Sequence, residues 1–211
     1  MVLRRITWIL LVCLVAALPA SANLVANGSF ENPVVSANAR CDTWGANGWT
    51  ASLAGSNPES TYIFNAASNG WVAAQGANVL TMFPSSGGPS VSQTLTTVVG
   101  QAYDFSFALL GASWYGQGTT VTVSWISNSV DLIGQWAQAA GTTTWETKHF
   151  LVTAGSTSDT IKLTYADYQT GFWGAANIDN VQVNAAVPEP GSLCAMLVGL
   201  AGVIGLKRRP R

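Results

Sequence analysis

Charge is scarce in this chain of 211 residues, of which only 9% are Asp, Glu, Lys or Arg. Six of the nine basic residues lie close to the two ends: Arg4, Arg5, Lys207, Arg208, Arg209 and Arg211. Residues 23–186 keep three basic and nine acidic side chains, so their net charge is 3 minus 9, or −6. Nucleic acids bind to clusters of Lys and Arg. The composition therefore argues against a nucleic-acid partner.

Cysteine and histidine are scarce as well. Cys13 and Cys194 fall in the two apolar ends, so Cys41 has no partner for a disulfide within residues 23–186. Two fates stay open for Cys41, a buried or free thiol and a disulfide between two chains. The single histidine, His149, excludes a histidine cluster for zinc. A Ser-His-Asp triad would also depend on this one residue, which sits in an expected strand and is typical of a surface position.

Long apolar runs occur only at the ends of the chain. At the N-terminus, two arginines precede an apolar stretch from Ile6 to Leu18, and Ala20-Ser21-Ala22 supplies the small-x-small pattern that signal peptidase cuts. A helix packed onto a domain would need a polar face toward the solvent, and this stretch has almost none. We therefore predict a signal peptide over residues 1–22, with the exported chain beginning near Asn23.

The second apolar run covers Leu193 to Leu206, about fourteen residues or roughly 21 Å of helix, against a hydrocarbon core of roughly 30 Å. Pro188 and Pro190 stop a helix from entering this run from upstream. The basic residues after Leu206 stay on the cytoplasmic side by the positive-inside rule. We predict a short single transmembrane helix over residues 193–206, which anchors an intermediate in the inner membrane.

This C-terminal arrangement resembles the PEP-CTERM sorting signal of Gram-negative bacteria. The residues that carry the resemblance are the triplet Pro188, Glu189 and Pro190, followed by the apolar run and the Arg-rich end. The resemblance implies that an exosortase cuts near the triplet and passes the protein to the cell surface or the exopolysaccharide layer. It indicates where the protein goes, and says nothing of what residues 23–186 do there.

Residues 23–186 show no sustained helical period, but many short alternating runs between Gly, Ser, Thr and Asn. Such runs bury one face of a sheet each and predict an all-β domain. The predicted strands are residues 62–64, 79–83, 91–98, 103–109, 121–125, 149–153, 160–165 and 177–183. This number of short strands indicates one two-sheet antiparallel β-sandwich.

Five segments resemble the galactose-binding-like jelly roll of several carbohydrate-binding modules. They are NLVANGSFENP, NGW, SVSQTLTTVVGQAYDFSFALLG, TTWETKHFLVTA and NIDNVQV. The resemblance implies that the first and last strands lie side by side. It also implies a structural calcium ion held by Glu31 and Asp179 with backbone carbonyls. The alternative is that the two carboxylates only accept hydrogen bonds from turn amides. No organic cofactor is expected.

Eight of the nine tryptophans lie between residues 23 and 186. We expect Trp125 in the core, and the resemblance implies that Trp49 and Trp145 are packed as well. Indole rings also stack on the apolar faces of sugars, and amide side chains both donate to and accept from hydroxyls. The candidate glycan-binding residues in expected loops are Trp114, Tyr115, Gln117, Gln135, Trp136 and Trp173. Each tryptophan has the alternative role of anchoring its loop onto the sandwich.

The sequence thus predicts an exported, surface-sorted protein that binds polysaccharide without catalysis. The alternative is a structural or adhesive matrix protein whose exposed aromatic residues contact protein partners. A glycoside hydrolase would need two carboxylates across a cleft. The acids available for that role are Asp131, Glu146, Asp159 and Asp167, but no motif pairs them.

Overall fold

The structure is a computed structural model, and it describes residues 23–37, 39–41, 48–52, 61–70, 72–83, 88–113, 119–139, 144–166 and 174–186. The chain divides into two units, residues 23–185 on the one hand and residues 1–22 with 186–211 on the other. The predicted signal peptide, the sorting triplet and the predicted helix 193–206 lie outside the described residues. Within the described ranges, no helix is long and apolar enough to cross a membrane.

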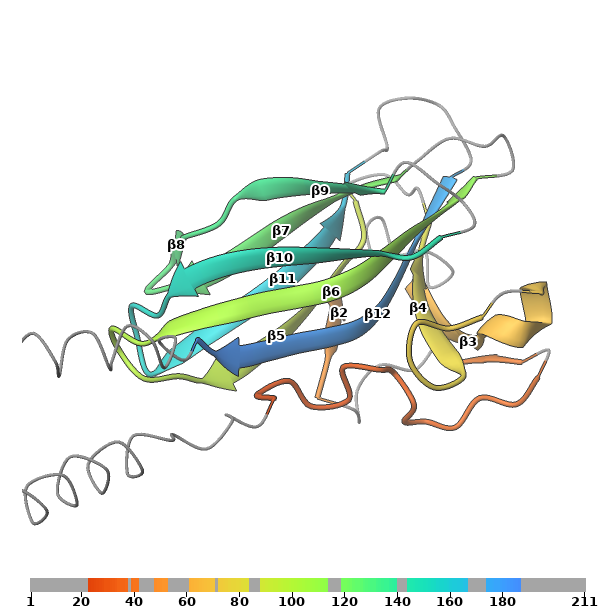
Figure 1. Ribbon diagram of the computed structural model, residues 1–211, viewed down its shortest axis with the longest axis horizontal. Helices are drawn as coiled ribbons and strands as arrows, with labels where there is room; N and C mark the ends of the chain where they lie inside the picture. Colours follow the sequence, from red (N-terminus) through yellow and green to blue (C-terminus); the bar gives the residue numbers. More distant parts are fainter. Residues whose placement is uncertain are drawn as a thin grey trace, which may run out of the picture. The chain divides into compact units, whose positions relative to one another are not determined.

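Residues 23–185 form two antiparallel sheets, so the prediction of an all-β, two-sheet architecture is confirmed (Figure 1). Sheet A has the order β1-β3-β4-β12-β6-β10. Its strands are Arg40–Cys41, Thr61–Asn65, Asn78–Met82, Gly174–Ala185, Ala102–Ser113 and Glu146–Thr153 in that order. A 3-10 helix, Ala66–Asn69, follows β3.

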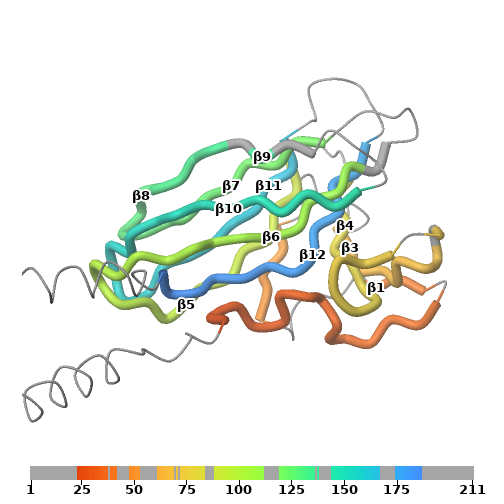
Figure 2. Tube along the Cα trace, viewed as in Figure 1, coloured from red at the N-terminus to blue at the C-terminus, as the bar shows by residue number. Residues whose placement is uncertain are grey.

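Sheet B has the order β2-β5-β11-β7-β8, and β9 also pairs with β7. Its strands β2, β5, β11, β7, β8 and β9 are Thr50–Ser52, Ser90–Thr96, Ser158–Tyr165, Thr119–Ser127, Val130–Asp131 and Gln135–Ala139. The long strands β6 and β12 pair over most of their length, and β12 therefore lies inside sheet A (Figure 2).

The main core lies between the two sheets and is built from alternate residues of the long strands. Phe105 and Phe107 of β6 and Val123 and Trp125 of β7 are fully buried. The Trp125 ring stacks on Tyr103 with 5.7 Å between ring centroids. Burial of each large apolar side chain stabilises the fold by about 1.5–3 kcal/mol. The predicted core position of Trp125 is confirmed.

The jelly-roll resemblance implies a first strand beside the last one, and residues 23–28 do run beside β12, although they do not form a regular strand. The Leu24 amide donates to the Val183 carbonyl at 2.9 Å, and the Val181 amide donates to the Gly28 carbonyl at 2.8 Å. The Asn23 side chain accepts a hydrogen bond from the Val183 amide at 2.8 Å. The two ends of residues 23–185 therefore close the sandwich against each other.

Two strand predictions need correction. Trp136 and Gln135 are in strand β9 and not in a loop, because β9 pairs with β7 in sheet B and Ala137 buries its side chain in the main core. The predicted strand 91–98 ends at Thr96, since the Val98 amide donates to the Tyr103 hydroxyl at 3.0 Å in the following turn. The short strands β1, β2 and β8 were not predicted.

Candidate functional site

The predicted aromatic site depends on two segments of sequence that adjoin neighbouring strands. Ser113, the last residue of β6, is the register partner of Gly174, the first residue of β12. Trp114, Tyr115 and Gln117 follow Ser113, and Trp173 precedes Gly174. These four lie outside the described residues, but the strands bring their points of attachment together at one end of sheet A.

The two other predicted candidates belong to sheet B. Trp136 of β9 is paired with Thr122 of β7, and Gln135 is paired with Val123. Gln135 is exposed. The Tyr165 hydroxyl of sheet B donates to the Gly174 carbonyl of sheet A at 3.2 Å. Tyr165 pairs with Val121 of β7, the same strand that pairs with Trp136. The hydrogen bond from Tyr165 therefore connects this part of sheet B with the start of β12 in sheet A.

Two tryptophans that we expected to pack do so. Trp49 is buried, packs against Phe30 in a tilted arrangement with 5.5 Å between ring centroids, and donates from its indole to the Asn27 carbonyl at 3.2 Å. Trp145 is half-buried against the small outer cluster of Phe64, Ala66 and Val79. Its indole donates to the Val72 carbonyl at 2.8 Å, and this bond holds the segment before β4 onto sheet A.

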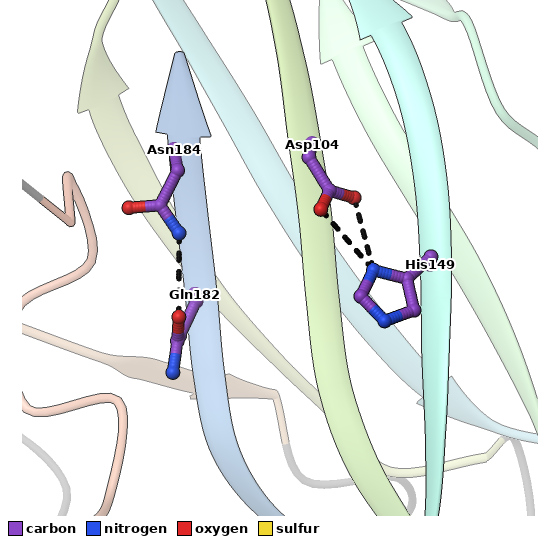
Figure 3. A network of polar contacts seen from close by, with 4 residues as sticks. All are labelled: Asp104, His149, Gln182 and Asn184. Carbon is purple, nitrogen blue, oxygen red and sulfur yellow. Dashed lines mark hydrogen bonds and ion pairs between the residues drawn. The ribbon is translucent and has the colours of Figure 1, made fainter. Parts of the chain in front are cut away.

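A row of polar side chains crosses the outer face of sheet A, and sequence analysis did not predict it. The row consists of Asn184 and Gln182 of β12, Asp104 of β6 and His149 of β10 (Figure 3). Phe105 points into the core, so its neighbour Asp104 points to the outer face. In register, Asn184 lies opposite Asp104 and Gln182 opposite Ser106, which is also the partner of His149.

The polar row consists of two separate hydrogen-bonded pairs, of which the side chains of Asp104 and His149 are exposed and Gln182 and Asn184 are half-buried. His149 Nδ1 lies 3.1 Å from Asp104 Oδ2, and the two side chains are 60% and 42% exposed. Asn184 Nδ2 donates to Gln182 Oε1 at 3.3 Å. Among the described residues, no serine or threonine hydroxyl forms a hydrogen bond with His149, so the Asp104–His149 pair does not extend to a Ser-His-Asp triad. The expected surface position of His149 is confirmed.

Glu31 and Asp179, the predicted calcium ligands, meet the same short loop before β4. Glu31 Oε1 accepts from the Ala77 and Asn78 amides, both at 2.8 Å. Asp179 Oδ2 accepts from the Gln75 amide at 2.8 Å, and its Oδ1 accepts from the Asn180 amide at 2.6 Å. Both carboxylates therefore accept hydrogen bonds from turn amides, as the alternative to a calcium site predicts.

The same two carboxylates lack a positive partner in the described part of the chain. Burial, opposed by the amide hydrogen bonds and reinforced by the nearby Glu31 charge, raises the pKa of Asp179 to about 7. Asn78 Oδ1 is buried and has no hydrogen-bond partner. Two carboxylates and an amide oxygen without a hydrogen-bond partner are the types of ligand that calcium binds. The described residues contain no group of three or more His, Cys, Asp or Glu side chains for a metal, so further ligands would be carbonyls or water.

Solved structures resemble this domain in fold at low sequence identity. The arabinose-bound α-L-arabinofuranosidase MgGH51 has 14% identity and a TM-score of 0.54, with coverage of 78% of this chain and 26% of that chain. TmCBM61 in complex with β-1,4-galactotriose has 17% identity and a TM-score of 0.48, covering 79% and 100%. The xylan-binding domain CBM22-1 from Paenibacillus barcinonensis Xyn10C has 17% identity and a TM-score of 0.49, covering 82% and 99%. The likeness to MgGH51, with a TM-score above 0.5, shows a similar fold over about a quarter of that chain.

The C-terminus matches a known signal. The PEP-CTERM protein-sorting motif covers residues 186–209, which confirms the sorting signal predicted from Pro188, Glu189 and Pro190. This motif implies export and sorting to the surface in Gram-negative bacteria. Comparison of the sequence with curated proteins gave no match.

Proposed function

We propose that an exosortase processes this protein at its sorting motif and that residues 23–185 then bind polysaccharide at the cell surface or in the exopolysaccharide layer, without catalysis. The observation that carries the proposal is the pairing of Ser113 with Gly174. In sequence, Trp114 and Tyr115 follow Ser113 directly and Trp173 precedes Gly174 directly, so two aromatic segments about sixty residues apart attach to adjacent strand ends.

The chemistry of these side chains suits sugars. Indole and phenol rings stack on the apolar faces of pyranose rings, and neighbouring amides bind hydroxyls. The polar row supports the same function because it offers amide, carboxylate and imidazole groups on the outer face of sheet A. From Ser113 to Asp104, β6 covers roughly 30 Å at about 3.3 Å per residue, which is long enough for several sugar rings.

The negative charge of the domain limits the kinds of polysaccharide that it can bind. With three basic and nine acidic residues between 23 and 186, the domain repels polyanions. In the described part of the chain, Lys148 pairs with Glu146 at 2.7 Å, so that lysine is not offered to an acidic sugar. We therefore propose a neutral polysaccharide as the ligand.

A pull-down of residues 23–186 with insoluble polysaccharides and the host's own exopolysaccharide tests this function. We expect the native domain to be retained and the triple variant Trp114→Ala, Trp136→Ala, Trp173→Ala to be lost, while both unfold cooperatively. Val72→Ala, on an exposed side chain of the loop before β4, is the matched control. Failure of the native domain to bind any polymer would refute the proposal, and concentration-dependent self-association would then favour the matrix-protein alternative. Release of reducing ends would refute the absence of catalysis.

We further propose that Glu31 and Asp179 hold a structural calcium ion that joins the first residues of the domain to β12. The support is their shared loop, their lack of a cationic partner in the described residues and the raised pKa of Asp179. We expect chelation to lower the unfolding temperature of the native domain and to have no effect on Glu31→Ala. An unchanged melting curve of the native domain on chelation would contradict the proposal.

A further inference from the structure

One end of the sandwich is formed by three turns, residues 97–101, 127–130 and 153–158, which we call the tether end (Figures 1 and 2). Hydrogen bonds join the turns to one another. The Thr97 amide donates to the Thr157 carbonyl at 3.1 Å, and the Gly100 amide donates to the Ala154 carbonyl at 2.8 Å. Asn128 Nδ2 donates to the Gly155 carbonyl at 3.0 Å. The tether end is therefore one connected surface.

The last strand finishes at this surface. Ala185, the final residue of β12, is the register partner of Tyr103, which follows the turn 97–101 directly. The segment that starts the exported part reaches the same place, because the Leu24 amide donates to the Val183 carbonyl. The chain thus leaves the domain at the tether end toward its sorting motif.

The three turns of the tether end expose apolar side chains and contain no charged residue, and the exposed Asp131 borders them next to Val130. Val98, Val99 and Val130 are 64%, 60% and 57% exposed. None of the residues in the three turns is Asp, Glu, Lys or Arg, although the domain as a whole is acidic. Leu132 and Leu151, next to the turns, are exposed as well. Of the seven large exposed hydrophobic side chains in the described residues, five therefore gather at this end.

Only residues 186–192 separate β12 from the apolar run 193–206. Fully extended, they span at most about 25 Å, at about 3.6 Å per residue. A tether of this length keeps the domain at an effective concentration on the order of millimolar near whatever holds the apolar run. Contacts that are too weak to bind a free protein then suffice to orient a tethered one.

We propose that, before the sorting cut, the tether end lies against the lipid surface of the inner membrane through Val98 and Val99, and that the cut releases it. This inference rests on the proposed function, because it requires the apolar run to sit in the bilayer. A lipid surface fits better than a protein partner since the end is small, its three turns contain no charged residue, and the predicted membrane segment follows it closely in sequence. Anionic headgroups repel the acidic remainder of the domain and leave this end as the face that can approach.

The test uses the chain from residue 23 to residue 211 in vesicles of phosphatidylethanolamine and phosphatidylglycerol. Cys41→Ser and Cys194→Ser remove the native thiols, and Val99→Cys or Val72→Cys accepts an environment-sensitive fluorophore. Val72 is 82% exposed and lies beside Trp145, at the far end of β10 from the tether end, so it is the matched control. We expect a blue shift of the label at position 99 and none at position 72.

Three outcomes are informative. A blue shift at position 99 that disappears when the chain is cut after residue 190, and that Val98→Ser with Val130→Ser reduces at least twofold, supports the inference. A chain that floats with the vesicles while its label at position 99 stays in water overturns it and leaves the membrane anchor intact. A chain that does not float at all refutes the anchor, and with it the inference, but not the binding of polysaccharide.

Discussion

At the scale of single residues, Asp159 is a carboxylate buried without a cation in the described part of the chain, and hydrogen bonds hold it. Its Oδ2 accepts from the Trp125 indole at 2.9 Å and its Oδ1 from the Ser156 hydroxyl at 2.6 Å. We expect Asp159→Ala to lower the free energy of unfolding by about 1–3 kcal/mol, because the indole N–H is left buried without an acceptor. Urea titration of Asp159→Ala, Trp125→Phe and the double variant measures the coupling, and strictly additive losses would contradict it.

The pH dependence of this carboxylate follows from the same contacts. Burial by itself would raise the pKa of Asp159, but hydrogen bonds, of which the one from Ser156 is the strongest, outweigh it and lower the pKa below the usual value. The contribution of Asp159 to stability is therefore present above the unfolded pKa of about 3.9 and is lost as the pH falls through the lower folded pKa. Asp159→Asn should unfold with a flatter pH profile below about pH 4 than the native domain.

The pH dependence that Asp179 gives to stability has the opposite sign to that of Asp159. Burial raises the pKa of Asp179 to about 7, so the folded domain keeps a proton that the unfolded chain releases near its ordinary pKa of 3.8. Without metal, stability due to this group falls as the pH rises from about 4 to 7. We expect the stability of Asp179→Asn, measured in the presence of a chelator, not to decrease in this way as the pH rises from about 4 to 7. An identical slope for the native domain and the variant over this range would show that Asp179 titrates normally.

At the scale of elements, alternation predicted the long strands because each buries one face against the main core. Tyr103, Phe105 and Phe107 in β6 are an example. The two-residue strands β1 and β8 are too short to show a period, and β9 has only alanine to mark its buried side. The polar row also escaped prediction, since Asp104 and His149 meet only through the register of β6 with β10. Sequence motifs located Glu31 and Asp179. The backbone amides that donate hydrogen bonds to them belong to a loop that has no recognisable sequence motif.

Gly28 is an element-level constraint, because it lets the first segment of the domain approach β12. A Cβ atom at position 28 would meet the Val181 carbonyl oxygen at 2.0 Å, closer than the pairing of these segments allows. We expect Gly28→Ala to cost about 1–3 kcal/mol or more. Gly70→Ala is the control, since a Cβ there meets nothing within 4 Å and only the positive φ of 70° costs about 1 kcal/mol. Equal losses in thermal unfolding would argue against close approach at Gly28.

At the scale of the whole molecule, the fold can close only when its last strand has arrived. β12 pairs with β4 and β6 and contributes Ile178, Val181 and Val183 to the main core. Gly28 and Leu24 bond to Val181 and Val183 of the same strand, beyond the stretch that pairs with β4. Export must therefore deliver the chain through Ala185 before the domain is complete, and the sorting motif at residues 186–209 follows immediately.

This order predicts where the surface form of the protein ends. In the proposed sorting sequence, the apolar run 193–206 holds the chain in the bilayer until the bond near Pro190 is cut, because transfer of these side chains to water is unfavourable. Intact mass measurement of the protein from the cell surface should give a chain without the basic residues after Leu206. Glu189→Ala should leave the uncut protein in the inner-membrane fraction, whereas Glu146→Ala, which removes a carboxylate of β10, should be sorted normally. Full-length C-terminal peptides recovered from the surface fraction would contradict the cut, and normal sorting of Glu189→Ala would show that the triplet is not what the sorting enzyme reads.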